Sequence, residues 1–211
     1  MKQLITLICF VMMAATGKAQ PSRYCMNAAD YLNDIWHPTP GVLQMKHRSK
    51  GQAIWFGGAT YRPYSGHKPT DKLLKKQALF IVHHDSLYIN CRHLNCQGIK
   101  FGNWYAPAFV FDRDYVLFAA PSIKSRQDAT MAGFFFGIAG AATVALSSSN
   151  DFCCYIYNPS TGLSELIDEP ILRRLIGERV DLQDALDQTE LKHRLLPETV
   201  LPMLRKAGLV E

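Results

Sequence analysis

The chain of 211 residues lacks the short motifs that mark many enzymes. It has no Gly-x-Ser-x-Gly turn around a nucleophilic serine, and no candidate Cys–His pair has a third group that the spacing identifies. Its glycine-rich stretch lies among apolar residues with no lysine after it, unlike a phosphate-binding loop. We therefore predict a non-catalytic protein with no catalytic, cofactor-binding or metal-binding residues. An enzyme of unknown class is the last alternative.

Paired metal-binding knuckles are also missing, because the chain contains no Cys-x-x-Cys motif. One compact group does contain the side-chain types that zinc prefers: His83, His84, Cys91, His93 and Cys96. Neighbouring histidines in a polar turn are usually exposed, and structural zinc usually has two paired knuckles. For the two cysteines of this group, a disulfide, buried thiols and a metal site all stay open.

Cysteine is scarce, and five cysteines follow residue 19: Cys25, Cys91, Cys96, Cys153 and Cys154. This odd number leaves at least one thiol unpaired or shared with another chain. The spacing favours a local bridge between Cys91 and Cys96, and a long one from Cys25 to one of the vicinal cysteines. The sequence alone does not fix the connectivity.

Charge is nearly absent from the first nineteen residues. Lys2 precedes an uncharged run over 4–17, which is shorter than the roughly 20 apolar residues that a membrane span needs. A positive start, a short apolar run and small residues at Gly17 and Ala19 are typical of a signal peptide. We predict cleavage after Ala19 and export to the periplasm or cell envelope. The alternative is a buried N-terminal helix.

Acidic residues are rare between residues 41 and 100, where ten Lys or Arg face only Asp71 and Asp85. Residues 151–211 instead carry eleven acids and seven bases. A basic surface of this kind attracts an anionic glycan, a lipid headgroup or nucleic acid, although a solvated face is the plainer interpretation. Because an exported protein rarely meets nucleic acid, we predict no nucleic-acid partner.

Aromatic residues accompany this basic stretch, and they either stack on a glycan or pack in the core. They are Trp55, Phe56, Tyr61, Tyr64, Trp104 and Tyr105.

The overall pattern predicts an α+β fold with an antiparallel β-rich part over residues 20–122. Strand-like runs flank short polar turns at 79–82 with 87–91 and at 108–111 with 115–118, as in β-hairpins. A helical period fits only residues 71–77 of this part.

Residues 152–211 predict another β-hairpin followed by C-terminal helices. The hairpin joins 155–157 to 163–167. Asp168 and Gly177 match the start and end of a first helix, Asp181 starts a second that runs toward Arg194, and a third extends from Pro197 to Gly208. We expect this part to form one domain with residues 20–122.

Between these parts, residues 123–151 contain an uncharged Gly/Ala-rich stretch at 129–146. Its small residues at Gly133, Gly137 and Gly140 allow close helix approach, which predicts oligomerisation if the segment is a helix. The alternatives are a buried core helix, a helix or hairpin on a membrane or partner surface, and an inner-membrane span. A span is disfavoured because eighteen residues cover only about 27 Å. The basic residues also lie on the wrong side for the positive-inside rule.

Three segments carry a family resemblance: residues 87–91, the Gly-rich stretch, and the Tyr-rich hairpin 155–162. With these, the chain resembles uncharacterised exported proteins of Bacteroidetes-type bacteria, a resemblance that implies no activity. Asn158 stands where that pattern leads us to expect an acidic residue. Residues 85–87 also resemble the short O-glycosylation triplet of those bacteria.

Two hypotheses of function follow. The first is a non-catalytic exported envelope protein that associates with an envelope partner or membrane surface through residues 129–146. The alternative is a soluble periplasmic module that binds an anionic glycan or another anion through its basic, aromatic first half.

Overall fold

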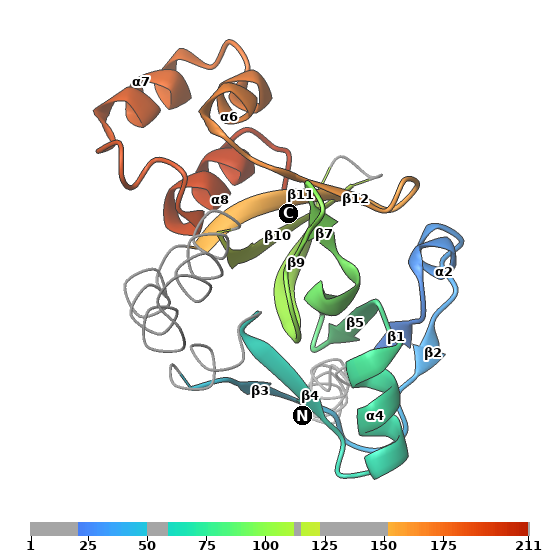
Figure 1. Ribbon diagram of the computed structural model, residues 1–211. Helices are drawn as coiled ribbons and strands as arrows, with labels where there is room; N and C mark the ends of the chain where they lie inside the picture. Colours follow the sequence, from blue (N-terminus) through green and yellow to red (C-terminus); the bar gives the residue numbers. More distant parts are fainter. Residues whose placement is uncertain (1–20, 50–58, 112–114, 123–151, 211) are drawn as a thin grey trace, which may run out of the picture.

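The computed structural model describes residues 21–49, 59–111, 115–122 and 152–210, and it confirms the α+β fold (Figure 1). The main sheet is antiparallel, with strand order β12-β11-β10-β9-β6-β5-β1-β2, and β4 pairs with β9 and with β3. Its strands are β1 Arg23–Cys25, β2 His37–Pro38, β3 Gln44–His47, β4 Tyr61–Tyr64, β5 Phe80–His83, β6 Ser86–Asn90, β9 Tyr105–Phe111, β10 Tyr115–Pro121, β11 Phe152–Asn158 and β12 Leu163–Leu166. A second, small sheet contains β7 Asn95–Cys96 and β8 Ile99–Lys100. The helices are α2 Ala28–Leu32, α4 Lys68–Lys76, the 3-10 helix η1 Cys91–His93, α6 Glu169–Ile176, α7 Val180–Gln188 and α8 Pro197–Lys206.

All three predicted hairpins are present, as β5–β6, β9–β10 and β11–β12. The β5–β6 turn is tighter than its polar sequence predicts, because His83 and Ser86 pair with each other. Only His84 and Asp85 make the turn, with φ angles of 47° and 59°. Two successive positive φ values are typical of the two-residue turn that best matches the twist of a hairpin.

The sheet separates the interior into different clusters, because successive side chains of a strand point to opposite faces. On β9, Ala106 and Ala108 belong to a large cluster on one face, which we call face A. Phe109 and Phe111 lie on the other face, face B, where they pack with α6 to α8. Tyr105 also lies on face B, in a separate cluster with α4. Figure 1 accordingly shows the C-terminal helices and α4 at different ends of the sheet.

The helix boundaries follow the sequence predictions closely, with one exception. Asp168 caps α6 by accepting a hydrogen bond from the backbone N–H of Ile171 at 2.9 Å, and Gly177 ends that helix with a φ of 61°. The third predicted helix is confirmed as α8, and the helical period over 71–77 is confirmed within the longer α4.

The exception is α7, for which the predicted cap and length were wrong. Arg179 occupies the cap position, and Asp181 lies in the first turn, where its carboxylate pairs with Arg179 at 2.9 Å. The helix ends at Gln188, because Thr189 has an extended backbone and donates its hydroxyl to the Ala185 carbonyl at 2.8 Å. It therefore stops short of Arg194.

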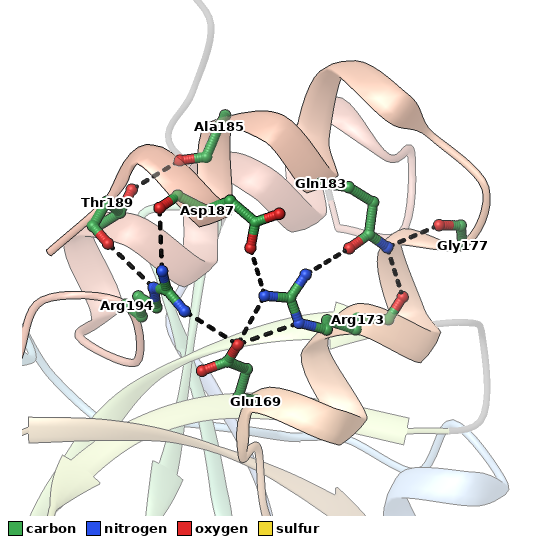
Figure 2. A network of polar contacts seen from close by, with 8 residues as sticks. All are labelled: Glu169, Arg173, Gly177, Gln183, Ala185, Asp187, Thr189 and Arg194. Carbon is green, nitrogen blue, oxygen red and sulfur yellow. Dashed lines mark hydrogen bonds and ion pairs between the residues drawn. The ribbon is translucent and has the colours of Figure 1, made fainter. Parts of the chain in front are cut away.

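Arg194 instead joins a polar network that connects α6 with α7 and the segment after it (Figure 2). Arg173 binds Glu169 at 2.7 Å and Asp187 at 2.5 Å, and Arg194 binds Glu169 at 3.1 Å. Gln183 contributes its amide oxygen to Arg173 at 3.0 Å. This network fixes the two helices against each other at their polar faces.

The predictions for the signal peptide and for the Gly-rich segment 123–151 lie outside the described residues. Within the described ranges, no helix has the length and apolar character that crossing a membrane requires. On either side of that segment, β10 and β11 pair antiparallel, so that the main sheet includes strands from both parts of the chain.

Candidate anion-binding surface

The site begins at the C-terminal end of α4, which buried polar groups hold in place. The Tyr105 hydroxyl lies 2.6 Å from the carbonyl oxygen of Leu74 and 2.9 Å from that of Ala78. The Asn90 amide donates to the Ala78 carbonyl at 2.9 Å. The last carbonyls of a helix have no partner within the helix, so these contacts satisfy them and position Lys75, between the bonded residues.

Strands β3 and β4 form the neighbouring wall. Their alternation directs Met45 and Pro63 inward and leaves Lys46 and Arg62 exposed. Lys46 and Arg62 stand directly opposite each other in the pairing register. Like charges at directly opposite positions destabilise a sheet, so this pair costs stability unless an anion lies between or near them.

Trp104 is the centre of the site. Its indole ring has three cationic groups near it, with Arg48 at 5.0 Å, Lys75 at 5.2 Å and Arg62 at 5.3 Å from the ring centroid. We call these three residues with Trp104 the Trp104 cation cluster. Cation–π attraction stabilises each contact by about 0.5–2 kcal/mol. No two of the charges lie farther apart than about one Debye length at 0.1 M salt, so they also repel one another.

The backbone at Trp104 is unusual as well. Its φ angle is 87°, in a region that residues other than glycine rarely adopt. The indole Nε1 is buried and has no hydrogen-bond partner among the described residues. Holding a tryptophan in such a conformation costs on the order of 1–3 kcal/mol, and strain of this kind concentrates at functional sites.

The two exposed cations of the cluster, Arg62 and Lys75, have no carboxylate partner among the described residues. All ion pairs within the described part of the chain lie between residues 169 and 194, so neither Arg62 nor Lys75 takes part in one. The nearby acid in the sequence, Asp71, accepts hydrogen bonds from the backbone N–H and hydroxyl of Ser65 at 2.6 Å and 2.7 Å.

Arg48 is the buried cation of the cluster. It is 4% exposed and donates to the Ala59 carbonyl at 2.8 Å. Burial lowers the pKa of its guanidinium to about 10, so it still carries its charge at neutral pH. It adds positive field near the exposed pair Arg62 and Lys75.

Next to the cluster, Tyr64 follows Arg62 by two residues and therefore lies on the same side of β4. The Lys46 ammonium lies 3.6 Å from the centroid of its ring, and the side chain of Tyr64 is 39% exposed. This arrangement offers an aromatic ring beside a concentrated positive charge.

The predicted aromatic surface is thus divided by the fold. Tyr105 is buried in the α4 cluster, Tyr61 packs against it, and Trp104 is enclosed by cations. Tyr64 stays exposed, whereas Trp55 and Phe56 lie outside the described residues. The sequence did not predict that residues 48, 62, 75 and 104 converge. Its only signal for this convergence is the alternation of side chains along β3 and β4.

The histidine and cysteine group does not assemble. No set of three His, Cys, Asp or Glu side chains in the described ranges is arranged to hold a metal ion. His83 and His84 stack at 3.9 Å, and His83 Nδ1 lies 2.7 Å from the Ser22 hydroxyl. Cys91 and Cys96 are buried in the face A cluster.

The five cysteines at positions 25, 91, 96, 153 and 154 are thiols in this structure, and no two of them lie at disulfide distance. The predicted bridges stay predictions for the oxidised protein.

Comparison with known proteins now places the chain. A family of unknown function, DUF6563, matches residues 23–211. The chain belongs to this family. The match covers every element of the described fold, including the Trp104 cation cluster. No curated protein and no solved structure matches the chain.

Proposed function

We propose that this member of DUF6563 is a non-catalytic binding protein that recognises an anionic ligand at the Trp104 cation cluster. The observation that carries the proposal is the convergence of three cations on one indole ring, with no ion pair at Arg62 or Lys75 in the part of the chain that the structure describes. Charge-assisted hydrogen bonds contribute about 1.5–3 kcal/mol each, so two exposed cations are enough for measurable binding.

An anionic glycan is one ligand that fits this surface, because Tyr64 presents an exposed ring beside the Lys46 ammonium. The export signal over residues 1–19 would place such binding in the periplasm or at the cell surface of a Bacteroidetes-type bacterium. Attachment to an envelope partner or membrane through residues 129–146, and oligomerisation through Gly133, Gly137 and Gly140, stay separate predictions. Fractionation of the tagged protein tests the membrane attachment. Protein that stays with the membranes after a carbonate wash and is released only by detergent supports it.

The direct test compares dextran sulfate with uncharged dextran in a binding titration at low salt. We expect only the sulfated polymer to bind. The double variant Arg62→Ala/Lys75→Ala should weaken this binding at least about tenfold, which corresponds to one lost charge-assisted contact.

A matched control removes the same charge elsewhere. Arg174 and Lys206 are exposed residues of the C-terminal helices, and Arg174→Ala/Lys206→Ala changes the net charge equally. If the control weakens binding as much as the cluster variant, general charge rather than this site is responsible, and the proposal fails.

A further inference from the structure

We infer that the Trp104 cation cluster recognises a phosphate monoester group. This inference rests on the proposed function and names the chemistry of its ligand. It follows from the kinds of donor that the cluster exposes, from the charge of its exposed cations, and from the absence of a competing acid at these cations within the described ranges.

The exposed donors are a guanidinium and an ammonium. Arg62 has a planar fork that binds two oxygens of one group at the same time, and Lys75 supplies a further donor near the same indole ring. A carboxylate has two oxygens, which the fork alone would occupy. A phosphate monoester has three terminal oxygens, so one oxygen is left for the ammonium when the fork has bound two.

The charge of the cluster matches the same group. The two exposed cations, Arg62 and Lys75, carry two positive charges. A phosphate monoester carries about −1.5 to −2 near pH 7. A carboxylate or a sulfate ester carries a single negative charge and would leave more of the repulsion in place.

Titration distinguishes this ligand from other anions. The second ionisation of a phosphate monoester has a pKa of about 6, so the ester loses charge between pH 7.5 and 5. Arginine and lysine side chains ordinarily titrate well above that range. Two histidines lie near the cluster. The His93 imidazole bonds to the backbone of Lys76 at the end of α4, and desolvation lowers its pKa. His47 Nδ1 lies 2.8 Å from the carbonyl oxygen of Arg48.

The experiment is calorimetric titration of the purified protein with glucose 6-phosphate, glucose 6-sulfate and glucuronate at low salt. We expect the phosphate ester to bind at least about tenfold more tightly than the other two. Its affinity should fall severalfold between pH 7.5 and 5, in the parent protein and in both the His93→Gln and the His47→Gln variants. The Arg62→Ala variant should lose the preference.

Titration with inorganic phosphate shows whether the protein recognises the phosphate group alone or the whole sugar phosphate. Binding equal to that of glucose 6-phosphate would mean that the phosphate alone is recognised, and weaker binding would mean that the sugar also contributes. Either result supports the inference when glucose 6-sulfate and glucuronate bind more weakly.

Equal binding of the three sugars would overturn the inference and leave the proposed anion-binding function intact. Failure of all three sugars and of dextran sulfate would overturn both. A preference that Arg62→Ala retains would also contradict the inference, because the fork would then play no part.

Discussion

The hydroxyl of Tyr105 on β9 lies 2.6 Å from the carbonyl oxygen of Leu74 in α4. Tyr105 is 1% exposed, so this contact is made without competition from water. It connects the sheet directly to the helix end that carries Lys75. The position of Lys75 in the Trp104 cation cluster therefore depends on the buried hydroxyl of Tyr105, a residue outside the cluster.

Replacing this hydroxyl should destabilise the protein. We expect Tyr105→Phe to lower the free energy of unfolding by about 0.5–1.5 kcal/mol, because it removes the short buried hydrogen bond to the Leu74 carbonyl and leaves only the Asn90 amide at 3.4 Å. Urea denaturation measures the loss. Tyr24→Phe is the control, since Tyr24 is on the same face of the sheet and its hydroxyl makes no hydrogen bond within the described residues. Equal losses in both variants would show that the hydrogen bond to Leu74 does not account for the loss of stability in Tyr105→Phe.

The cap of α6 gives a second prediction. Asp168→Ala should lower the free energy of unfolding by about 1 kcal/mol, because the backbone N–H of Ile171 loses its acceptor at the helix start. The control Asp184→Ala removes an exposed acid from the middle of α7 and should change stability little. A thermal or urea midpoint that moves equally for both variants would contradict the capping role.

Acid should weaken the network that joins α6 and α7. The hydrogen bond from Arg173 is the main factor that lowers the pKa of both Glu169 and Asp187. A depressed pKa in the folded state stabilises the protein above the ordinary pKa of the group, and this stabilisation is lost as pH falls through the folded value. Stability should therefore decrease below about pH 4.5, the ordinary value for Glu169.

The variant Arg173→Gln tests the origin of this decrease. We expect it to be less stable near pH 7 and to show a shallower fall in the unfolding midpoint between pH 5 and 2.5. Lys192→Gln removes an exposed charge of the same region and should keep the parent profile. A parent-like slope in Arg173→Gln would assign the acid sensitivity to other carboxylates.

The cysteines should differ in reactivity toward a thiol reagent at pH 8. Burial raises the pKa of both the Cys25 and the Cys154 thiols to about 12, so almost no reactive thiolate forms there. Among the five described cysteines, Cys153 is the one with intermediate exposure, and we expect it to react first of these in the reduced folded protein. Peptide mass mapping identifies the modified site, and modification of all five of these cysteines in denaturant is the control. Faster labelling of Cys25 would mean that its cluster opens readily.

Much of the fold was accessible from the sequence, because local chemistry determines it. The β5–β6 hairpin has β-forming residues on both sides of a polar turn, and α6 has a capping acid at one end and a glycine at the other. The end of α7 was missed, since nothing in residues 189–194 breaks a helix as strongly as glycine or proline. Its actual stop depends on the Thr189 backbone and on Arg194 binding Glu169, 25 residues away in the chain.

The candidate site was harder to predict for a similar reason. Excess positive charge over residues 41–100 is visible in the sequence. Which cations converge depends on tertiary structure, because residues 48, 62, 75 and 104 come from different elements. The positive φ of Trp104 has no sequence signature at all, since tryptophan is not a residue that favours it.

The alternation of β11 has a chemical consequence for its two adjacent cysteines. Cys153 packs against the face A cluster, whereas Cys154 belongs to the cluster beneath the C-terminal helices. A bond between these two sulfur atoms would require the strand to abandon its pairing with β10, which joins Cys153 to Ala120 and Cys154 to Ala119. As long as the sheet is intact, Cys153 and Cys154 therefore cannot form a disulfide with each other. Any disulfide that either cysteine forms must reach a distant residue or another molecule.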